Sequence, residues 1–303
     1  MKRGFALALT LWIVAIMSLA TAFYLSYSKE IVQKTTLLNK KLKAIFEVES
    51  AVELLKFYGT TGELSKNSIR NNGLKELFPN FPTKIFIDGR VIKWGKITII
   101  LQDTAGLIGT NDIEGLANCL IANKKISKDK KAIIKDSIND WLDNNSFRLL
   151  NGAESSFYKN HGYAYLPRNE NYFSSVDELF LVRGLVDSNL DKKLLKSNLV
   201  ISNYTSRNVM TMDIELLGAV YNLSKIDIEQ LKKAKKDSDD TFLKLFYQQN
   251  QEAFQSEKTG TSPSRIVKAT VMYDTKKIHE QVSLIISFRL GRMGASEVLE
   301  YNN

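Results

Sequence analysis

The sequence has few of the residues from which enzyme and metal sites are usually built. Its 303 residues include one cysteine, Cys119, and two histidines, His161 and His279, which lie far apart. A single cysteine cannot form a disulfide within the chain, so folding needs no oxidising compartment. No P-loop, H-E-x-x-H, G-x-S-x-G or cysteine-cluster motif occurs. We therefore do not expect an enzyme.

Concentrated positive charge is missing as well. The formal net charge is +9, but the lysines are spread along the chain, with runs at 124–135, 192–196 and 232–236. Spread lysines usually mark solvated helix faces, so no nucleic-acid partner is expected. With 44% hydrophobic and 25% charged residues, the chain is long enough to fold into two modest domains.

Charged residues are absent altogether from residues 5–28. A helix of that length spans about 36 Å, which is enough to cross a bilayer core. Lys2 and Arg3 precede it and should stay in the cytoplasm, which places the chain after Lys29 on the far side of the membrane. One alternative stays open: an A-x-A pattern ends at Ala22, so the segment could be a Sec signal peptide of a secreted protein or enzyme.

Helical periodicity continues beyond this apolar run. Apolar residues recur mostly three or four positions apart from Ile31 to Leu55, and no proline or glycine occurs before Gly59. We predict one helix that runs from the membrane to about Tyr58, with its outer half amphipathic and packed on another element. Residues 59–73 are predicted to form a loop.

The rest of the chain predicts strands, then helices, then strands again. The predicted strands are 84–87, 97–101, 266–273 and 281–290, and the predicted helices are 113–123, 128–144, 175–182, 213–221, 225–237 and 240–254. Late strands can return to pair with early ones, so we predict an α+β fold whose antiparallel sheet is interrupted by a helical insertion. A small separate C-terminal β domain is the alternative.

Several segments, read in order, resemble the K-type minor pseudopilins of type II secretion, the GspK family. Gly4-Phe5 before an apolar helix resembles the class III leader of type IV pilins and pseudopilins. Three further segments resemble family motifs, "D-x-x-G-x-x-x-x-N" at 103–111, "D-W-x-D … G-A-E" at 140–154 and "P-x-N … S-V-x-E-L-x-x-V-x-G" at 167–184. At 208–212 the chain departs from the family's usual "N-x-N-T-A".

This resemblance implies a pilin-like fold in which the long N-terminal transmembrane helix packs on an antiparallel sheet that carries a large α-helical insertion. The implied parts are a prepilin leader at 1–4 and an N-terminal helix at 5–58, of which 5–28 is transmembrane. A pilin-like α/β domain would follow at 59–112 and 256–303, with the α-helical insertion domain at 113–255.

The resemblance also implies processing at the start of the chain. Prepilin peptidase would cut between Gly4 and Phe5, and the new amine of Phe5 would be N-methylated. Leu9 stands where most pilin-like subunits have a glutamate. The K-type subunits that the chain resembles also lack this acid. An uncharged residue there suits a first subunit, because no neighbour above it offers a terminal amine.

The implied protein is a single-pass protein of the bacterial inner membrane with its C-terminal domain in the periplasm. It would sit at the tip of the pseudopilus in a hetero-oligomer with I-type and J-type minor pseudopilins, and it would support protein export. A tip pilin of a type IV pilus or a DNA-uptake system is the remaining alternative. In that case the +9 charge would favour phosphate binding.

A calcium site is a further implication of the resemblance. Asp143, Asn145 and Glu154 would supply the hard oxygen ligands that Ca²⁺ prefers, with Asp140 nearby. The alternative interpretation of residues 143–145 is a capped helix end.

Overall fold

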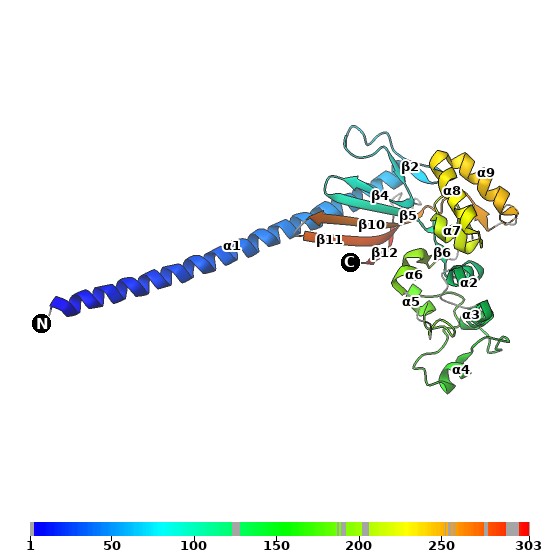
Figure 1. The fold of residues 1–303 in the computed structure, drawn as a ribbon, viewed down its shortest axis with the longest axis horizontal. Helices are drawn as coiled ribbons and strands as arrows, with labels where there is room; N and C mark the ends of the chain where they lie inside the picture. The colour runs from blue at the N-terminus through cyan, green and yellow to red at the C-terminus, as the bar shows by residue number, and fades with distance from the viewer. Residues whose placement is uncertain are drawn as a thin grey trace.

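The fold is dominated by one helix that extends far beyond the folded head (Figure 1). The computed structural model describes residues 3–122, 128–186, 188, 192–201, 206–251, 253, 256, 258–275, 278–288 and 297–302. The helix, α1, spans Arg3–Thr61, so the predicted continuous helix is confirmed. Its buried residues from Ala44 to Tyr58 recur every three or four positions, so one face of its outer end packs on the head.

That face of α1 covers a five-stranded sheet. The order is β12 (Glu297–Asn302), β11 (Ile278–Ser287), β10 (Ile266–Thr275), β5 (Ile97–Asp103), β4 (Asp88–Trp94), and every pair is antiparallel. Val267 lies opposite Asp103 at the centre, so late strands do return to pair with early ones. Side chains alternate between buried and half-buried along β5, and the buried ones share a core with α1.

Short strands correct the prediction of a loop at 59–73. β1 (Glu63–Leu64) and β2 (Ser68–Arg70) pair there, and β2 also pairs with β3 (Lys84–Phe86). The edge strands β4 and β12 were not predicted. Asp88, Arg90 and Lys93 hide the β pattern of β4, and charge of this kind is usual where an edge must resist pairing with another chain.

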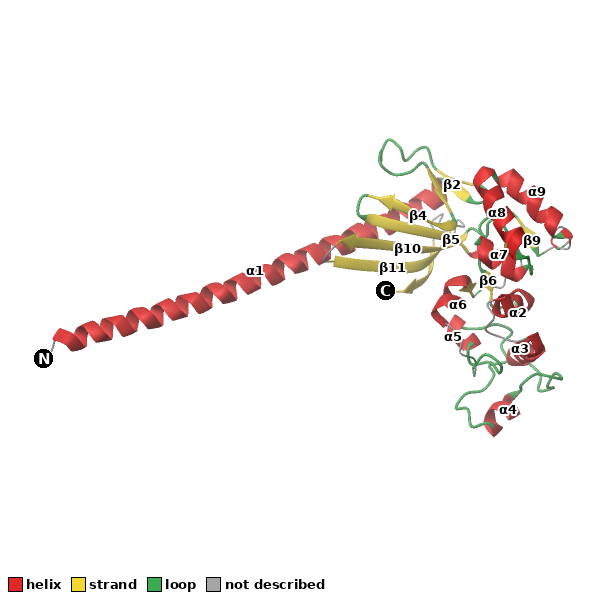
Figure 2. Ribbon diagram, viewed as in Figure 1, coloured by secondary structure: helices red, strands yellow, loops and turns green. Residues whose placement is uncertain are grey.

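The helical part lies beyond the sheet, at the end of the molecule farthest from the N-terminus (Figure 2). Its helices are α2 (Ile113–Ala122), α3 (Lys128–Leu142), α4 (Ser155–Asn160), α5 (Val176–Leu179), α6 (Lys192–Asn198), α7 (Ile214–Val220), α8 (Lys225–Asp237) and α9 (Asp239–Gln249). Two short helices, α4 and α6, were not predicted, and the helix predicted at 175–182 shrinks to four residues. Some predicted positions lie outside the described residues: Met1, Lys2, Asn123, Phe254 and 289–290.

Small parallel pairings connect the ends of this part. β6 (Ile108–Gly109) pairs with β7 (Leu199–Val200), and β8 (Arg207–Asn208) pairs with β9 (Thr259–Gly260). The described residues form two hydrophobic cores, one between α1 and the sheet and one among the helices. The boundaries predicted at 113 and 255 remain predictions, but two cores are what a sheet domain with a helical insertion requires.

Candidate functional site

The sequence-predicted site residues lie in two separate places. Gly4, Phe5 and Leu9 belong to the free end of α1, and the acidic residues belong to the helical part at the other end of the molecule (Figure 1). Gly4 and Phe5 have helical backbone. The Leu9 side chain is half-exposed. The two regions lie at opposite ends of the molecule and are described separately.

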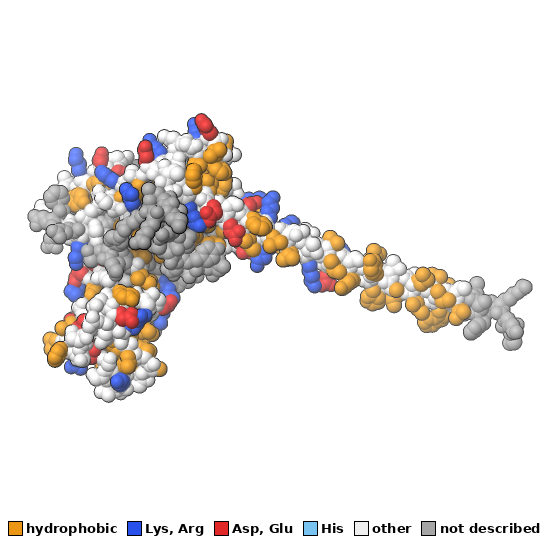
Figure 3. Space-filling model, turned by 180° about the vertical axis from the view of Figure 1, so that it is seen from behind, with side chains coloured by type: hydrophobic (Ala, Val, Ile, Leu, Met, Phe, Trp, Pro, Cys, Tyr) orange, Lys and Arg blue, Asp and Glu red, His pale blue; other side chains and the backbone are white. Residues whose placement is uncertain are grey.

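The free half of α1 is an apolar surface that nothing in the described chain covers. Large side chains such as Trp12, Met17 and Phe23 are 65–71% exposed there. The most apolar 18-residue window has a mean hydropathy of 1.8 and is 0% buried. Figure 3 shows these side chains along the rod, with charged side chains becoming frequent only towards the head. The helix is long and apolar enough to anchor the chain in a membrane.

Three carboxylates meet where α3 ends and α4 begins. Asp140, Asp143 and Glu154 each offer one oxygen, and these atoms all lie within 4.8 Å of one another. We call these three residues the acidic cluster. The structure therefore brings together the predicted Asp143 and Glu154, and it adds Asp140 as a full member. The third predicted ligand, Asn145, accepts the N–H of Phe147 through its side-chain oxygen at 2.7 Å.

Burial makes the acidic cluster electrostatically costly. Asp140 is fully buried and Glu154 is 97% buried. Desolvation raises the pKa of both carboxyls, and the negative charge of Asp143 raises both further. The Oε1 atom of Glu154 has no hydrogen-bond partner within the part of the chain that the structure describes. Three crowded carboxylates and one unpaired buried oxygen fit a hard cation such as Ca²⁺.

A second loop holds the end of α3 in place. Asn169 donates its backbone N–H to the Trp141 carbonyl at 3.3 Å, and Asn171 donates to the Leu142 carbonyl at 2.8 Å. Both asparagines have left-handed φ values, 57° and 60°, a region that asparagine tolerates better than most residues. These contacts satisfy carbonyls that a helix end leaves open. The sequence predicted the motif at 167–184, but not that this loop holds the helix end that carries the acidic cluster.

Glu178 also holds the end of α3 in place. Its carboxylate accepts the indole N–H of Trp141 at 2.9 Å, and both the N–H and the hydroxyl of Ser174 at 2.7 Å. Glu178 and Trp141 are both buried. The family-like motif at 175–184 therefore acts through packing that positions α3.

Asp103 joins the two cores. Its fully buried carboxylate accepts hydrogen bonds from Ser264 at 2.6 and 3.0 Å, from the Ala105 N–H at 3.3 Å, and from Asn208 and Thr211 at 3.0 Å each. Ser264 leads into β10, and Asn208 and Thr211 precede α7. The first residue of the 103–111 motif is thus a connection between the sheet and the helical part.

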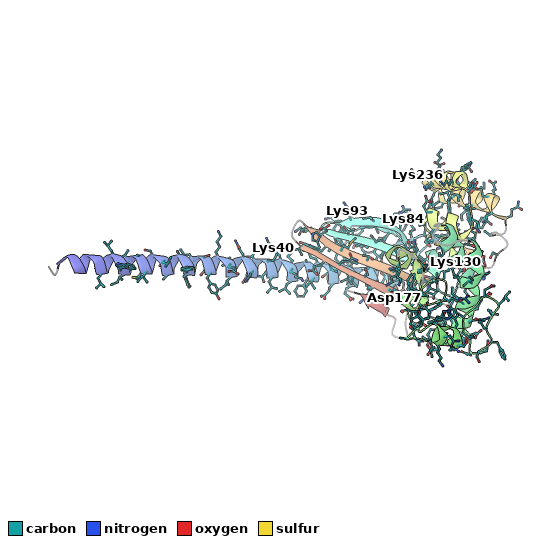
Figure 4. The ribbon with its side chains drawn as sticks, turned by 60° about the horizontal axis from the view of Figure 1, so that its bottom comes forward. Lys40, Lys84, Lys93, Lys130, Asp177 and Lys236 are labelled. Atoms are coloured by element: carbon teal, nitrogen blue, oxygen red, sulfur yellow. The ribbon has the colours of Figure 1, made fainter. Side chains whose placement is uncertain are left out.

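The remaining candidate residues make local contacts. His161 ends α4 and stacks on Phe157 with 4.0 Å between ring centroids, and His279 pairs with Asp274 at 2.7 Å. Cys119 is buried in the helical core. Lysines labelled in Figure 4 lie on α1, β3, β4, α3 and α8, so the positive charge is distributed over the molecule as the sequence indicates.

Comparison with known proteins identifies relatives of the helical part and of the whole fold. Residues 111–196 match the family model described as Type II secretion system (T2SS), protein K. A search of the curated proteins finds no match. Among solved structures, a chain of the GspK-GspI-GspJ complex from the enterotoxigenic Escherichia coli type 2 secretion system is similar, with a TM-score of 0.58 and 16% sequence identity.

The structural similarity covers 89% of this chain and 98% of that chain, which at this identity shows a shared fold. The predicted pilin-like α+β fold with a helical insertion is thereby confirmed. The resemblance of this chain to the K-type minor pseudopilins of type II secretion is therefore confirmed, by the protein K family model over residues 111–196 and by the solved complex for its fold.

Proposed function

We propose that this protein is a minor pseudopilin at the tip of the type II secretion pseudopilus. There it starts fibre assembly with other minor pseudopilins and supports the export of folded proteins across the outer membrane. Its role is structural and not enzymatic. The observation that carries the proposal is the uncovered, membrane-length apolar half of α1, joined at its far end to a bulky helical part.

The uncovered half of α1 needs an apolar environment. Exposing such a surface to water costs about 25 cal/mol per Å². Lipid covers it while the protein is anchored in the inner membrane, and neighbouring helices cover it in the fibre. Lys2 and Arg3 keep the N-terminus cytoplasmic before processing, so the head lies in the periplasm.

Two features favour the tip over an internal position. Leu9 supplies no charge to pair with the terminal amine of a neighbour. The helical part stands beyond the sheet, where a further subunit would have to stack (Figure 1). An uncharged position 9 and an obstructed upper surface are both suited to a first subunit.

The partners follow from the fold. The similar solved chain comes from a complex of GspK with GspI and GspJ, so we assign I-type and J-type minor pseudopilins as partners. The full chain, extracted in detergent, is expected to co-purify with both. Ile226 on α8 is 71% exposed, and Phe46 on α1 is 64% exposed. Phe46→Glu should weaken co-purification, whereas Ile226→Glu should leave it unchanged because Ile226 lies on α8 and not on α1.

Two results would contradict this assignment. The first is a wild-type chain that co-purifies with neither partner. The second is a chain that binds pilins of a DNA-uptake machine and is retained on DNA in a salt-dependent manner.

For the acidic cluster, we propose a Ca²⁺ ion held by Asp140, Asp143 and Glu154, with Asn145 as a further oxygen donor. Bound calcium would supply the positive charge that offsets the crowded carboxylates. Calorimetric titration of the full chain in detergent should show heat and a raised melting temperature, and Glu154→Gln should weaken both. A wild-type titration with neither heat nor stabilisation contradicts the site.

A further inference from the structure

Two apolar side chains project from the loop that joins α3 to α4. Phe147 is 85% exposed and Leu150 is 90% exposed, more than Trp12 of the membrane-anchoring segment at 71%. The loop lies at the end of the helical part away from the sheet, and hydrophobic side chains are visible on the surface of this lobe (Figure 3). We call residues 143–152 the display loop. Large apolar groups held in water in this way mark contact sites more often than chance.

The display loop is held by hydrogen bonds and is not loosely exposed. Asn151 donates both its backbone and side-chain N–H groups to Asp136 at 3.0 Å. Arg183 donates to the carbonyls of Asn151 and Gly152 at 3.2 and 2.8 Å. The backbone between Phe147 and Leu150 therefore has a defined shape.

Further hydrogen bonds of the display loop are accepted by carboxylates of the acidic cluster. The N–H of Leu149 donates to both oxygens of Asp140, at 3.1 and 3.2 Å. The N–H of Asn145 donates to Asp143 at 3.1 Å. A Cβ atom at Gly152 would lie 1.9 Å from the Asp140 carboxylate, so the loop backbone packs directly against it. A movement of the Asp140 or Asp143 carboxylate therefore moves the display loop.

We propose that a divalent cation bound by the acidic cluster locks the display loop and so fixes Phe147 and Leu150 in their exposed positions. The inference rests on the proposed cation site and adds a regulatory role for it. A second observation supports a ligand there: the Oε1 atom of Glu154, a 97% buried member of the cluster, has no hydrogen-bond partner among the residues that the structure describes. Without the cation, three like charges repel one another, and the loop that they hold opens more often.

The effect of calcium binding on the opening of the display loop has a predictable size. A ligand that binds only the closed loop lowers the open population by the factor 1 + [L]/Kd, which is about 100-fold when calcium is present at 100 times its Kd. The amides of Leu149 and Asn151 report this opening directly, because their hydrogen bonds end on Asp140 and Asp136. The helices α8 and α9 lie outside the loop and serve as an internal reference.

The test is hydrogen exchange of the full chain in detergent micelles, with CaCl₂ or with EGTA. Calcium should slow exchange in residues 143–152 by up to about 100-fold and leave α8 and α9 nearly unchanged. Glu154→Gln removes one charged ligand but none of the loop hydrogen bonds described above, so this variant should lose the calcium effect and stay folded.

Calorimetry run in parallel separates the possible failures. Heat of calcium binding without slower loop exchange overturns the locking proposal and leaves the cation site standing. Equal slowing in α8, α9 and the loop also overturns it, because a global stabilisation is not a lock. No binding heat at all overturns the cation site and the lock together, whereas the tip position would be unaffected.

Discussion

At the residue scale, position 4 decides between a pseudopilin leader and a cleaved signal peptide. Gly4 has no side chain, so a protease can approach the backbone closely. Gly4→Val is expected to block leader removal, and N-terminal sequencing of membrane-extracted protein checks this. Ala22→Val is the matched control, because it should leave the cut before Phe5 unchanged. A mature chain that begins at Phe23, and is lost in Ala22→Val, would show that the segment is a Sec signal.

Glu154 gives a second prediction at this scale, through the pH dependence of stability. Burial raises its pKa and that of Asp140 above their ordinary values of 4.5 and 3.8, and nearby carboxylates raise them further, Asp140 and Asp143 for Glu154 and Asp143 and Asp136 for Asp140. Above these ordinary values the folded state binds more protons than the unfolded state, so this contribution makes stability fall as pH rises through the raised pKa values. In EGTA, the melting temperature of the wild type should therefore fall, relative to that of Glu154→Gln, as pH rises from about 4.5 to 7.

Comparison with the variant is needed because other acids act in the opposite direction. Lys131 and Lys135 lower the pKa of Glu114, so its contribution to stability grows as pH rises towards the ordinary value of 4.5 and is fully present above it. The contribution of Glu114 is the same in the wild type and in Glu154→Gln, so it cancels in the difference between their melting temperatures. A difference that does not change with pH, or that changes in the opposite direction, would contradict the assigned repulsion.

At the element scale, the helices were easier to predict than the edge strands. Helix α8 was predicted with its observed bounds, because Ser224 caps it with a capping box and apolar positions recur along one face. Strand β4 was missed because Arg90 and Lys93 interrupt its apolar pattern, and an edge strand needs only one packed face. The two pairs of two-residue parallel strands have no periodicity from which they could be predicted.

The candidate site also combines residues that the sequence predicts with contacts that it does not. Asp143 and Glu154 could be predicted from a family-like motif, and Asp140 was already noted as their neighbour. The contribution of Asn169 could not be predicted, because it depends on the fold bringing residues 169 and 141 together. Local sequence predicts which residues can bind a cation, whereas long-range contacts decide how their helix is held.

Asp103 gives a testable prediction about the connection between the sheet and the helical part. Asp103→Ala removes one acceptor from the buried side chains of Asn208 and Thr211 and from the half-buried Ser264, and each hydrogen bond lost to a charged group costs about 1.5–3 kcal/mol. We expect the free energy of unfolding in urea to fall by about 3–5 kcal/mol, with the sheet and the helical part no longer unfolding together. Asp213→Ala, at the exposed N-cap of α7, is the control and should cost about 1 kcal/mol. Equal losses for the two variants would show that Asp103 does not join the parts.

At the scale of the whole molecule, α1 connects two environments. It is about 88 Å long, so in the proposed anchored state, with residues 5–28 in the membrane, roughly 50 Å would separate the bilayer from the far end of the helix. In the part of the chain that the structure describes, the head packs on the last turns of α1, where the fully buried Ala44 and Ala51 allow close approach to the sheet. The helical part, with the acidic cluster and the display loop, is thus held well away from the membrane.

Leu9 tests the position of the whole subunit in the fibre. A carboxylate at a bilayer centre costs about 2.5–3.5 kcal/mol unless it is paired. A tip subunit has no terminal amine above it, so Leu9→Glu should lower both co-purification with the I-type and J-type partners and secretion. Leu9→Ala keeps the position uncharged and should behave as the wild type in both measurements. An internal subunit would instead pair the new carboxylate with a neighbour's amine, so normal secretion and full complex recovery in Leu9→Glu would place this protein below the tip.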